Sequence, residues 1–284
     1  MKTQRIAVKI AVSLCVIGGL ISCSNLPLIP DTQILQVDDL QLESVVRRHD
    51  QAVYTLVFES GAANCIQRWQ QVLQQLPAEV NVFAYNRPGY CNSSDAATQR
   101  TSQNIVHELR LALHQQGLKP PYVLIGHSLG GLYMQQFARQ YPDEVQGLVL
   151  VDAMYPGFLK SPEEFPLYTK VGMSIFLSNT VKQEVHLAHT SGLMIDALQN
   201  IDDKPIVRMF NQPTGATPID FDFGVFNRDE KLLEKIWNMY PFAKIVVVDS
   251  SHQIQETSPE LVLQAIQDVM QAHGPLQQDK GSKL

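Results

Sequence analysis

The sequence predicts an α/β fold with a mostly parallel sheet and helices on both faces. Strand-like runs alternate with helix-like segments along most of the chain, which is the pattern of a parallel sheet with helical crossovers. The runs at residues 122–125 and 145–152 are dominated by valine, leucine and isoleucine, as expected of strands buried on both faces. Ligands of such sheets bind at the carboxyl ends of the strands, so we expect the functional residues there.

The amino-terminal half of the predicted fold alternates strands with helices. Its strand-like runs cover residues 41–48, 54–59 and 80–85. Apolar residues at helical spacing predict one helix over 65–76, which Pro77 ends, and another over about 103–116. Thr101 is expected to cap the second helix and Gly117 to end it.

The stretch 122–137 reads YVLIGHSLGGLYMQQF and contains the pattern G-x-S-x-G, with Ser128 at its centre. It joins a strand-like run to a helical segment at 129–140, so the chain must turn sharply at the serine. Such a turn leaves Ser128 strained, with its hydroxyl exposed above the strand. Gly126 and Gly130 let strand and helix approach closely. The alternative is an ordinary strand–turn–helix in which the serine only caps the helix.

In the carboxyl-terminal half, the alternation of strands and helices is interrupted once. After the strand at 145–152, residues 154–204 carry prolines and amphipathic pieces around 171–177 and 181–198. The alternation then resumes and ends in a helix that Pro259 opens. The remaining elements are a strand at 205–210, a helix at 230–239 and a strand at 244–248.

Composition excludes several classes of function. The 284 residues are 45% hydrophobic and 18% charged, which suits one domain with a substantial core. The formal charge of −6, without a dense basic run, argues against a nucleic-acid partner. The four cysteines show no C-x-x-C spacing and the histidines no H-E-x-x-H, so we expect no metal site.

The first 22 residues are typical of a secretory signal peptide. A basic start with Lys2, Arg5 and Lys9 precedes an apolar run at residues 10–21, which is too short to span a membrane. Removing these three cations, with no acidic residue lost, changes the formal charge from −6 to −9. We therefore expect an exported protein.

Leu20-Ile21-Ser22-Cys23 resembles the lipobox of bacterial lipoproteins, which implies that Cys23 becomes the lipidated first residue of the mature chain. A general signal peptide with a chance cysteine is the alternative. Residues 23–40 are then expected to form a tether, with two prolines within 25–31. The resemblance implies a lipid anchor in a bacterial membrane, and in a two-membrane cell we expect the outer one.

Several segments together resemble the serine-type α/β-hydrolases, in the order of that family and from about residue 54 to 271. The matching segments are Glu59-Ser60-Gly61, Asn86-Arg87-Pro88-Gly89-Tyr90, 126–131, 148–152, Ser251-His252 and Ser258-Pro259-Glu260. The family commonly has a His-Gly pair where this chain has Glu59-Ser60. The resemblance implies a hydrolase core over 41–153 and 205–275, a helical cap over 154–204 and a flexible tail over 276–284. The apolar residues of the cap would line a pocket or bury the cap against the core.

The resemblance also implies roles for individual residues. Ser128 would be the nucleophile and His252 the general base, because a serine hydroxyl is a weak nucleophile at neutral pH. The backbone N–H groups of Leu129 and Ala62 would form the oxyanion hole. No metal or organic cofactor is implied. A serine nucleophile also disfavours the aspartate-based dehalogenase and epoxide hydrolase reactions of this fold.

The acid of the triad is the least determined member. Asp152 ends the strongest strand after the serine, at the sheet edge where the site must lie, and is our choice. A structural role in capping the following turn is the alternative for it. Three later aspartates compete for the role, while Asp249 more simply orients its own loop. They are Asp220, Asp222 and Asp229.

Cys65 and Cys91 remain after processing, and the fold implied by the resemblance places their loops side by side. An oxidising compartment makes a disulfide between them reasonable, and two buried free thiols are the alternative. The expected function is a carboxylic-ester hydrolase of the cell envelope acting on a small-molecule ester. A thioesterase, an amidase, a perhydrolase and a non-catalytic binding lipoprotein with this fold are the alternatives.

Overall fold

The computed structural model describes residues 29–212, 224–272, 274 and 276. The predicted signal peptide, Cys23, Asp220 and Asp222 lie outside the described residues, as does nearly all of the predicted tail. None of the helices in the described part of the chain is both long and apolar enough to span a bilayer.

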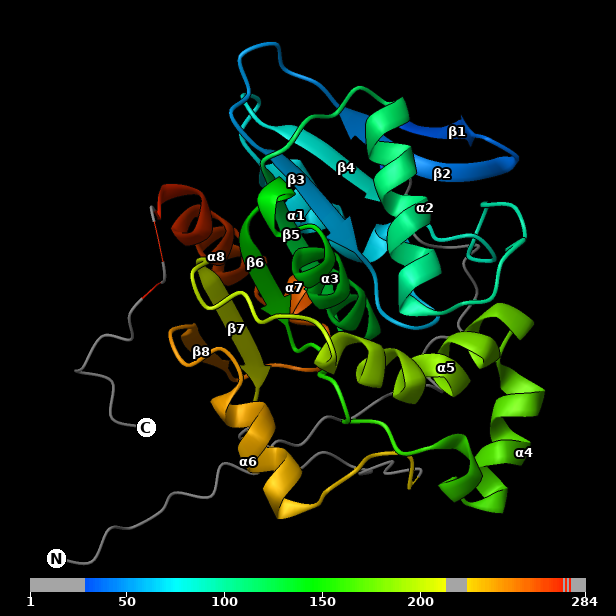
Figure 1. The fold of residues 1–284 in the computed structure, drawn as a ribbon. Helices are drawn as coiled ribbons and strands as arrows, with labels where there is room; N and C mark the ends of the chain where they lie inside the picture. The colour runs from blue at the N-terminus through cyan, green and yellow to red at the C-terminus, as the bar shows by residue number, and fades with distance from the viewer. Residues whose placement is uncertain (1–28, 213–223, 273, 275, 277–284) are drawn as a thin grey trace, which may run out of the picture.

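Eight strands form one sheet in the order β1-β2-β4-β3-β5-β6-β7-β8 (Figure 1). Strand β2 pairs antiparallel with β1 and β4, and all later pairs are parallel. The strands are β1 Thr32–Val37, β2 Leu40–Arg47, β3 Thr55–Glu59, β4 Asn81–Tyr85, β5 Tyr122–His127, β6 Val145–Val151, β7 Ile206–Asn211 and β8 Lys244–Val248. The predicted α/β class with a mostly parallel sheet is confirmed.

Helices cover both faces of the sheet, and a separate hydrophobic cluster lies under each cover. Helices α2 Ser102–Gln115 and α3 Leu129–Gln140 pack on one face, where the cluster includes Leu109 and Phe137. Helices α1 Gln70–Gln75 and α8 Pro259–Gln271 pack on the other, around Trp69 and Val262. Burial of both faces explains why the central strands are apolar at consecutive positions.

Most predicted helices form with small shifts at their ends. Helix α3 and strand β8 have the predicted bounds. The predicted helix at 65–76 begins as a 3₁₀ turn, η3 Ile66–Trp69, before α1. Thr101 caps α2 by accepting a hydrogen bond from the Asn104 N–H at 3.3 Å. The short helix α7 Ile254–Thr257, which precedes α8, was not predicted.

The predicted tether at 23–40 is too long, because β1 lies inside it. Asp38, with φ of 48°, turns the chain back into β2. Leu35 and Val37 are buried under α2, and Ile34 is exposed. The apolar pattern of this strand is interrupted by polar Thr32, Gln33 and Gln36. The sequence pattern therefore did not predict this half-buried edge strand.

The cap expected between β6 and β7 is helical. It consists of η5 Pro162–Glu164, α4 Leu167–Phe176 and α5 Asn179–Asp196. Helix α5 lies beside α2 and α3, and α4 projects away from the sheet (Figure 1). After α6 Glu230–Asn238, β8 completes the sheet edge.

Candidate active site

Ser128 occupies the sharp turn between β5 and α3. Its backbone angles are φ 52° and ψ −123°, a conformation that non-glycine residues rarely adopt and that is typical of functional sites. The residue as a whole is only 2% exposed, so the turn lies below the protein surface. Neighbouring loops enclose it: a Cβ atom at Gly61 would lie 3.0 Å from the Ser128 Cβ.

Glycines around the turn allow the close approach that the strained geometry needs. A Cβ at Gly130 would lie 2.5 Å from the Glu59 carbonyl oxygen, and one at Gly126 would lie 2.7 Å from the Gly131 Cα. Real Cβ atoms do not approach backbone atoms this closely. The start of α3 is therefore seated against the loop after β3, which contains the predicted oxyanion donor Ala62.

His252 and Asp152 lie in direct contact. The His252 Nδ1 is 2.6 Å from Asp152 Oδ2, and the two residues are 9% and 1% exposed. Asp152 follows β6, and His252 lies in the loop between β8 and α7. The backbone N–H of Asn211 donates to the other Asp152 oxygen at 3.3 Å. Because the carboxylate accepts the Nδ1 proton, the His252 Nε2 is left to act as a base.

Among the competing aspartates, Asp229 serves a different purpose. It caps α6, where its Oδ1 accepts from the Leu232 N–H at 3.1 Å. Asp220 and Asp222 lie outside the described residues. The structure therefore places Asp152, our choice from the sequence, against His252.

His127 is a site residue that sequence reasoning missed. It is fully buried, its ring centroid is 4.6 Å from that of His252, and its Nε2 lies 2.9 Å from the His252 carbonyl oxygen. A carbonyl only accepts, so Nε2 carries the proton. Burial, and then the nearby His252, hold the pKa of His127 well below its ordinary value, which keeps the ring neutral. His127 thus connects the His252 loop to the serine turn. In the sequence, only its position inside G-x-S-x-G indicated that it lies at the site.

The predicted oxyanion donors lie on the two sides of Ser128. Leu129 begins α3, and Ala62 follows Gly61 in the loop after β3. In the register of β3 and β5, Glu59 is opposite Gly126, which brings that loop to the serine turn. Leu129 is the first residue of α3, where a backbone N–H has no acceptor within the helix. Among the turn and loop hydrogen bonds of the described residues, Ala62 does not donate its backbone N–H. Both donors are thus available for a substrate oxygen.

Buried charges surround the oxyanion loop, and sequence reasoning did not foresee them. Arg87, 2% exposed, binds Glu59 at 2.5 Å and Glu184 of α5 at 2.9 Å. Tyr85 also donates its hydroxyl to Glu59 at 2.6 Å. Burial raises the pKa of Glu59 above its ordinary value, and Arg87 opposes that shift. The Glu59 that departs from the family's usual His-Gly pair is therefore part of a buried ion cluster.

The two predicted disulfide partners are joined. Cys65 and Cys91 form a disulfide with their Cα atoms 6.2 Å apart. Cys65 precedes η3, and Cys91 follows the Arg87 loop with φ of 51°. The bond connects the chain just after the oxyanion loop to the chain just after Arg87.

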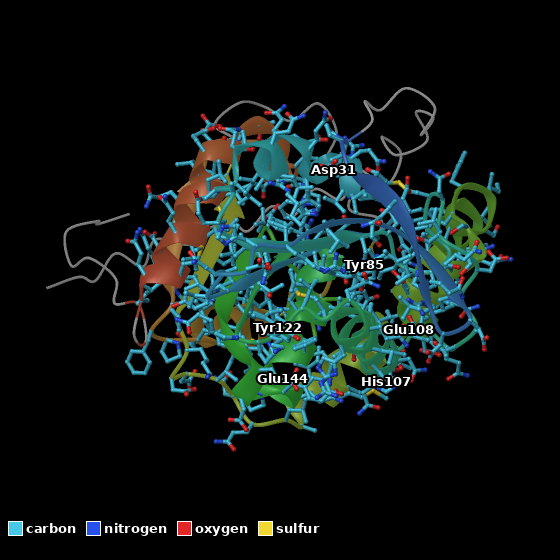
Figure 2. The ribbon with its side chains drawn as sticks, turned by 90° about the horizontal axis from the view of Figure 1, so that it is seen from above. Asp31, Tyr85, His107, Glu108, Tyr122 and Glu144 are labelled. Atoms are coloured by element: carbon cyan, nitrogen blue, oxygen red, sulfur yellow. A yellow bond between two sulfur atoms is a disulfide. The ribbon has the colours of Figure 1, made fainter. Side chains whose placement is uncertain are left out.

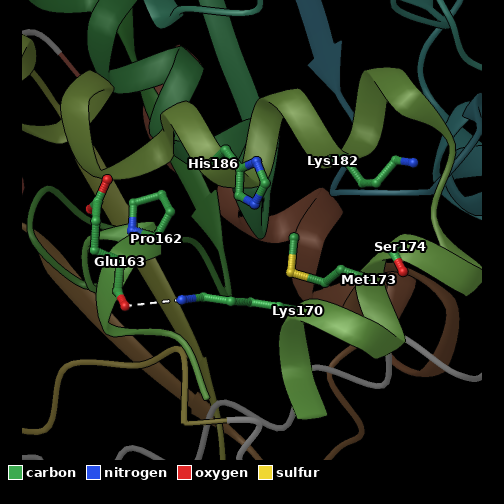
Figure 3. A pocket seen from close by; sticks show the side chains of 7 residues that line it. All are labelled: Pro162, Glu163, Lys170, Met173, Ser174, Lys182 and His186. Atoms are coloured by element: carbon green, nitrogen blue, oxygen red, sulfur yellow. Dashed lines mark hydrogen bonds between the residues drawn. The ribbon is translucent and has the colours of Figure 1, made fainter. Parts of the chain in front are cut away.

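The cap has a cavity of its own, which Figure 3 shows from close by. Its volume is about 380 Å³ and its lining comes from η5, α4 and α5: Pro162, Glu163, Lys170, Met173, Ser174, Lys182 and His186. Lys170 crosses it to donate to the Glu163 carbonyl at 3.0 Å. Of the apolar cap residues considered from the sequence, Phe158, Phe165 and Met173 belong to the hydrophobic core, whereas Ile175 and Phe176 are exposed. Burial against the core thus accounts for only part of the cap's apolar content.

Comparisons with known proteins agree with this architecture. A family model described as alpha/beta hydrolase fold matches residues 54–205. Uncharacterized protein YqjL of Bacillus subtilis is 25% identical over 227 residues, which are 76% of this chain and 83% of that protein. Among solved structures, carboxylesterase CesB (YbfK) of Bacillus subtilis aligns with a TM-score of 0.61 at 14% identity, covering 90% of this chain and 95% of that one. A thermophilic esterase of Thermogutta terrifontis aligns with a TM-score of 0.59 at 18% identity, covering 84% and 98%. At these identities the two structures are similar in fold.

Proposed function

The chain belongs to the alpha/beta hydrolase fold family, and on that premise we propose that it is a serine hydrolase that cleaves carboxylic esters. The observation that carries the proposal is the 2.6 Å contact between His252 and Asp152 beside the strained Ser128 turn. Nucleophile, acid and base then follow along the chain in the order Ser128, Asp152, His252, which is the order typical of this fold.

Each residue takes one step of an acyl transfer. The Ser128 hydroxyl attacks the ester carbonyl while the His252 Nε2 accepts its proton, and Asp152 stabilises the resulting imidazolium. The N–H groups of Leu129 and Ala62 hold the oxyanion, each contributing about 3 kcal/mol to lowering the barrier. His252 then protonates the leaving alcohol. In the second half, water attacks the acyl carbon while His252 accepts its proton, and His252 returns a proton to the Ser128 Oγ as the carboxylic acid leaves.

The same groups could act on related acyl compounds. A thioesterase, an amidase or a perhydrolase would use the same triad, and a hydrolase-fold lipoprotein that only binds its ligand is the non-catalytic alternative. An ester is the simplest substrate for this set of groups. The unpaired backbone donors beside a strained serine favour catalysis over binding alone.

Labelling with a fluorophosphonate is the direct test. The folded protein should form an adduct on Ser128, and Ser128→Ala should form none. A series of p-nitrophenyl esters of increasing acyl length, with the corresponding thioester and anilide, then identifies the substrate class. Absence of any adduct on the folded wild-type protein would contradict the proposal that it is a serine hydrolase. Faster cleavage of the thioester or of the anilide would identify the protein as a thioesterase or an amidase in place of an esterase.

We propose that the protein is located in a bacterial cell envelope and is held there by a lipid anchor. This proposal rests on the sequence Leu20-Ile21-Ser22-Cys23, which lies outside the described residues. Mass spectrometry of the mature amino terminus tests it. A diacylated or triacylated Cys23 is the expected result, and a free amine at another residue would contradict it.

A further inference from the structure

Arg87 makes five hydrogen bonds, one for each N–H of its guanidinium group. Two go to the carbonyl oxygens of Ser60 and Gly61, at 2.6 and 3.3 Å. The others go to Glu59 Oε1 at 2.5 Å and to the two carboxylate oxygens of Glu184 at 3.0 and 2.9 Å. When all five N–H groups are bonded, the plane of the guanidinium is fixed, and so is the orientation of the carbonyl and carboxylate groups that it binds.

The Gly61 carbonyl accepts from Arg87 and also from the Asn64 N–H, each at 3.3 Å, and these two bonds together set where the Ala62 N–H points. The Gly61 carbonyl and the Ala62 N–H belong to one planar trans peptide, in which the C=O and the N–H point in opposite directions. Arg87 holds the carbonyl end, so the N–H end is directed away from Arg87. This N–H is the predicted second donor of the oxyanion hole, and Gly61 lies against Ser128.

Glu184 holds Arg87 from the cap. It is fully buried on α5, 97 residues from Arg87, and also accepts from the Tyr90 hydroxyl at 2.6 Å. The Arg87 loop and α5 are in direct contact, because a Cβ at Gly89 would overlap Thr180 of α5. The cap is thereby joined to the loop that carries Ala62.

We propose that Arg87 and Glu184 are positioning residues for the oxyanion hole, with the cap helix α5 aiming the Ala62 N–H through the Arg87 guanidinium. The inference rests on the proposed function. It makes the cap a part of the active site, because a shift of α5 would turn the Gly61–Ala62 peptide.

The buried cluster also supplies a matched control. Glu108 of α2 is 7% exposed and binds Arg100 at 3.0 and 2.8 Å, and Arg100 in turn lies 3.5 Å from Glu184. Figure 2 labels Glu108 on α2, beside the exposed His107. Glu108→Gln and Glu184→Gln therefore each remove one buried carboxylate from the same cluster without changing its shape. Only Glu184→Gln removes the charge of a carboxylate that binds Arg87.

The kinetic test compares these two variants on the best p-nitrophenyl ester. Glu184→Gln should lower kcat by about 10- to 100-fold with KM changed less than about twofold. A misplaced N–H donor stabilises the oxyanion of the transition state less well, while substrate binding hardly depends on it. Inhibition by phenylboronic acid, which forms a tetrahedral adduct on serine, should weaken in parallel. Glu108→Gln should keep kcat within about twofold of the wild type. Equal loss of kcat in both variants, or a change in KM alone, would overturn the proposal.

A second measurement does not depend on activity. Amide hydrogen exchange of the Gly61–Ala62 segment should become faster in Glu184→Gln and in Arg87→Lys, and should stay unchanged in Glu108→Gln. Arg87→Lys keeps the charge and loses the planar fork, so it serves if Glu184→Gln does not fold. A wild-type protein that neither labels nor turns over esters would refute the proposed function, while the exchange data would still decide on the positioning. Unchanged exchange in both Glu184→Gln and Arg87→Lys would refute the positioning.

Discussion

The two sides of the candidate active site are built from different kinds of interaction. On the nucleophile side, β5, Ser128 and α3 are consecutive in sequence, and their geometry follows from a tight turn with glycines at its contacts. On the oxyanion side, the loop after β3 is held by Arg87, 28 residues beyond Glu59, and by Glu184, which is 97 residues beyond Arg87.

The difference shows where each side is vulnerable. A locally determined turn keeps its shape when distant residues change, because its strain is fixed by backbone sterics. A buried ion cluster depends on every partner, since removal of one leaves an uncompensated charge in a low-dielectric interior. We therefore expect substitutions on the nucleophile side to remove chemistry and leave the fold intact. Those on the oxyanion side should change geometry and stability together.

The largest expected effect is on the nucleophile side. Ser128→Ala should lower kcat by about 10⁶-fold, because covalent catalysis is lost and only binding and oxyanion effects remain. Its urea midpoint should stay close to that of the wild type. Turnover near the wild-type level would show that Ser128 is not the nucleophile. A large loss of stability would break the contrast between the two sides.

Asp152→Asn should have the next largest effect, about 10⁴-fold in kcat, because an amide at this position favours the wrong tautomer of His252. Asp229→Asn is the control, since Asp229 caps α6. Esterase kinetics of both variants provide the measurement. If Asp152→Asn kept near-normal turnover while Asp220→Asn or Asp222→Asn lost it, the acid would lie in the later loop.

The disulfide also belongs to the oxyanion side, and its loss should lower the stability of the fold. The double variant Cys65→Ser/Cys91→Ser opens a loop with a sequence separation of 26, which should lower the free energy of unfolding by about 3 kcal/mol on the chain-entropy model. Urea unfolding of the variant and the wild type measures it. Alkylatable thiols at both positions in the natively exported protein would contradict the bond.

The smallest effect expected is a pH dependence from His127. Its folded-state pKa is depressed by burial and by His252, so the unfolded chain binds a proton that the folded chain refuses. The His127 contribution to stability is therefore complete above its ordinary pKa of 6.5 and is lost as the pH falls from there toward the folded-state value. His127→Gln keeps a donor for the His252 carbonyl and should flatten the slope of the urea midpoint below pH 6.5. The same substitution at exposed His107 should leave the slope unchanged, and equal slopes in all three proteins would exclude His127 as the cause.

The sequence by itself determined the local parts of this protein. The bounds of α3 and β8 and the turn at Ser128 follow from apolar periodicity and from glycines within a few residues, which act over one turn or strand. His252 was also identifiable, because it follows the last strand and precedes a helix that Pro259 opens.

Only the tertiary structure decided which distant groups meet. Asp152 and His252 are 100 residues apart. The local pattern favoured Asp152, because it ends a strong strand, but did not exclude the later aspartates. The same holds for Arg87 and Glu184, and for β1, whose polar residues concealed it until its pairing with β2 was seen. Periodicity reports only that a side chain is buried. Charge pairing and strand pairing depend on distances through space, which the chain sets only when the whole sheet and its cap have assembled.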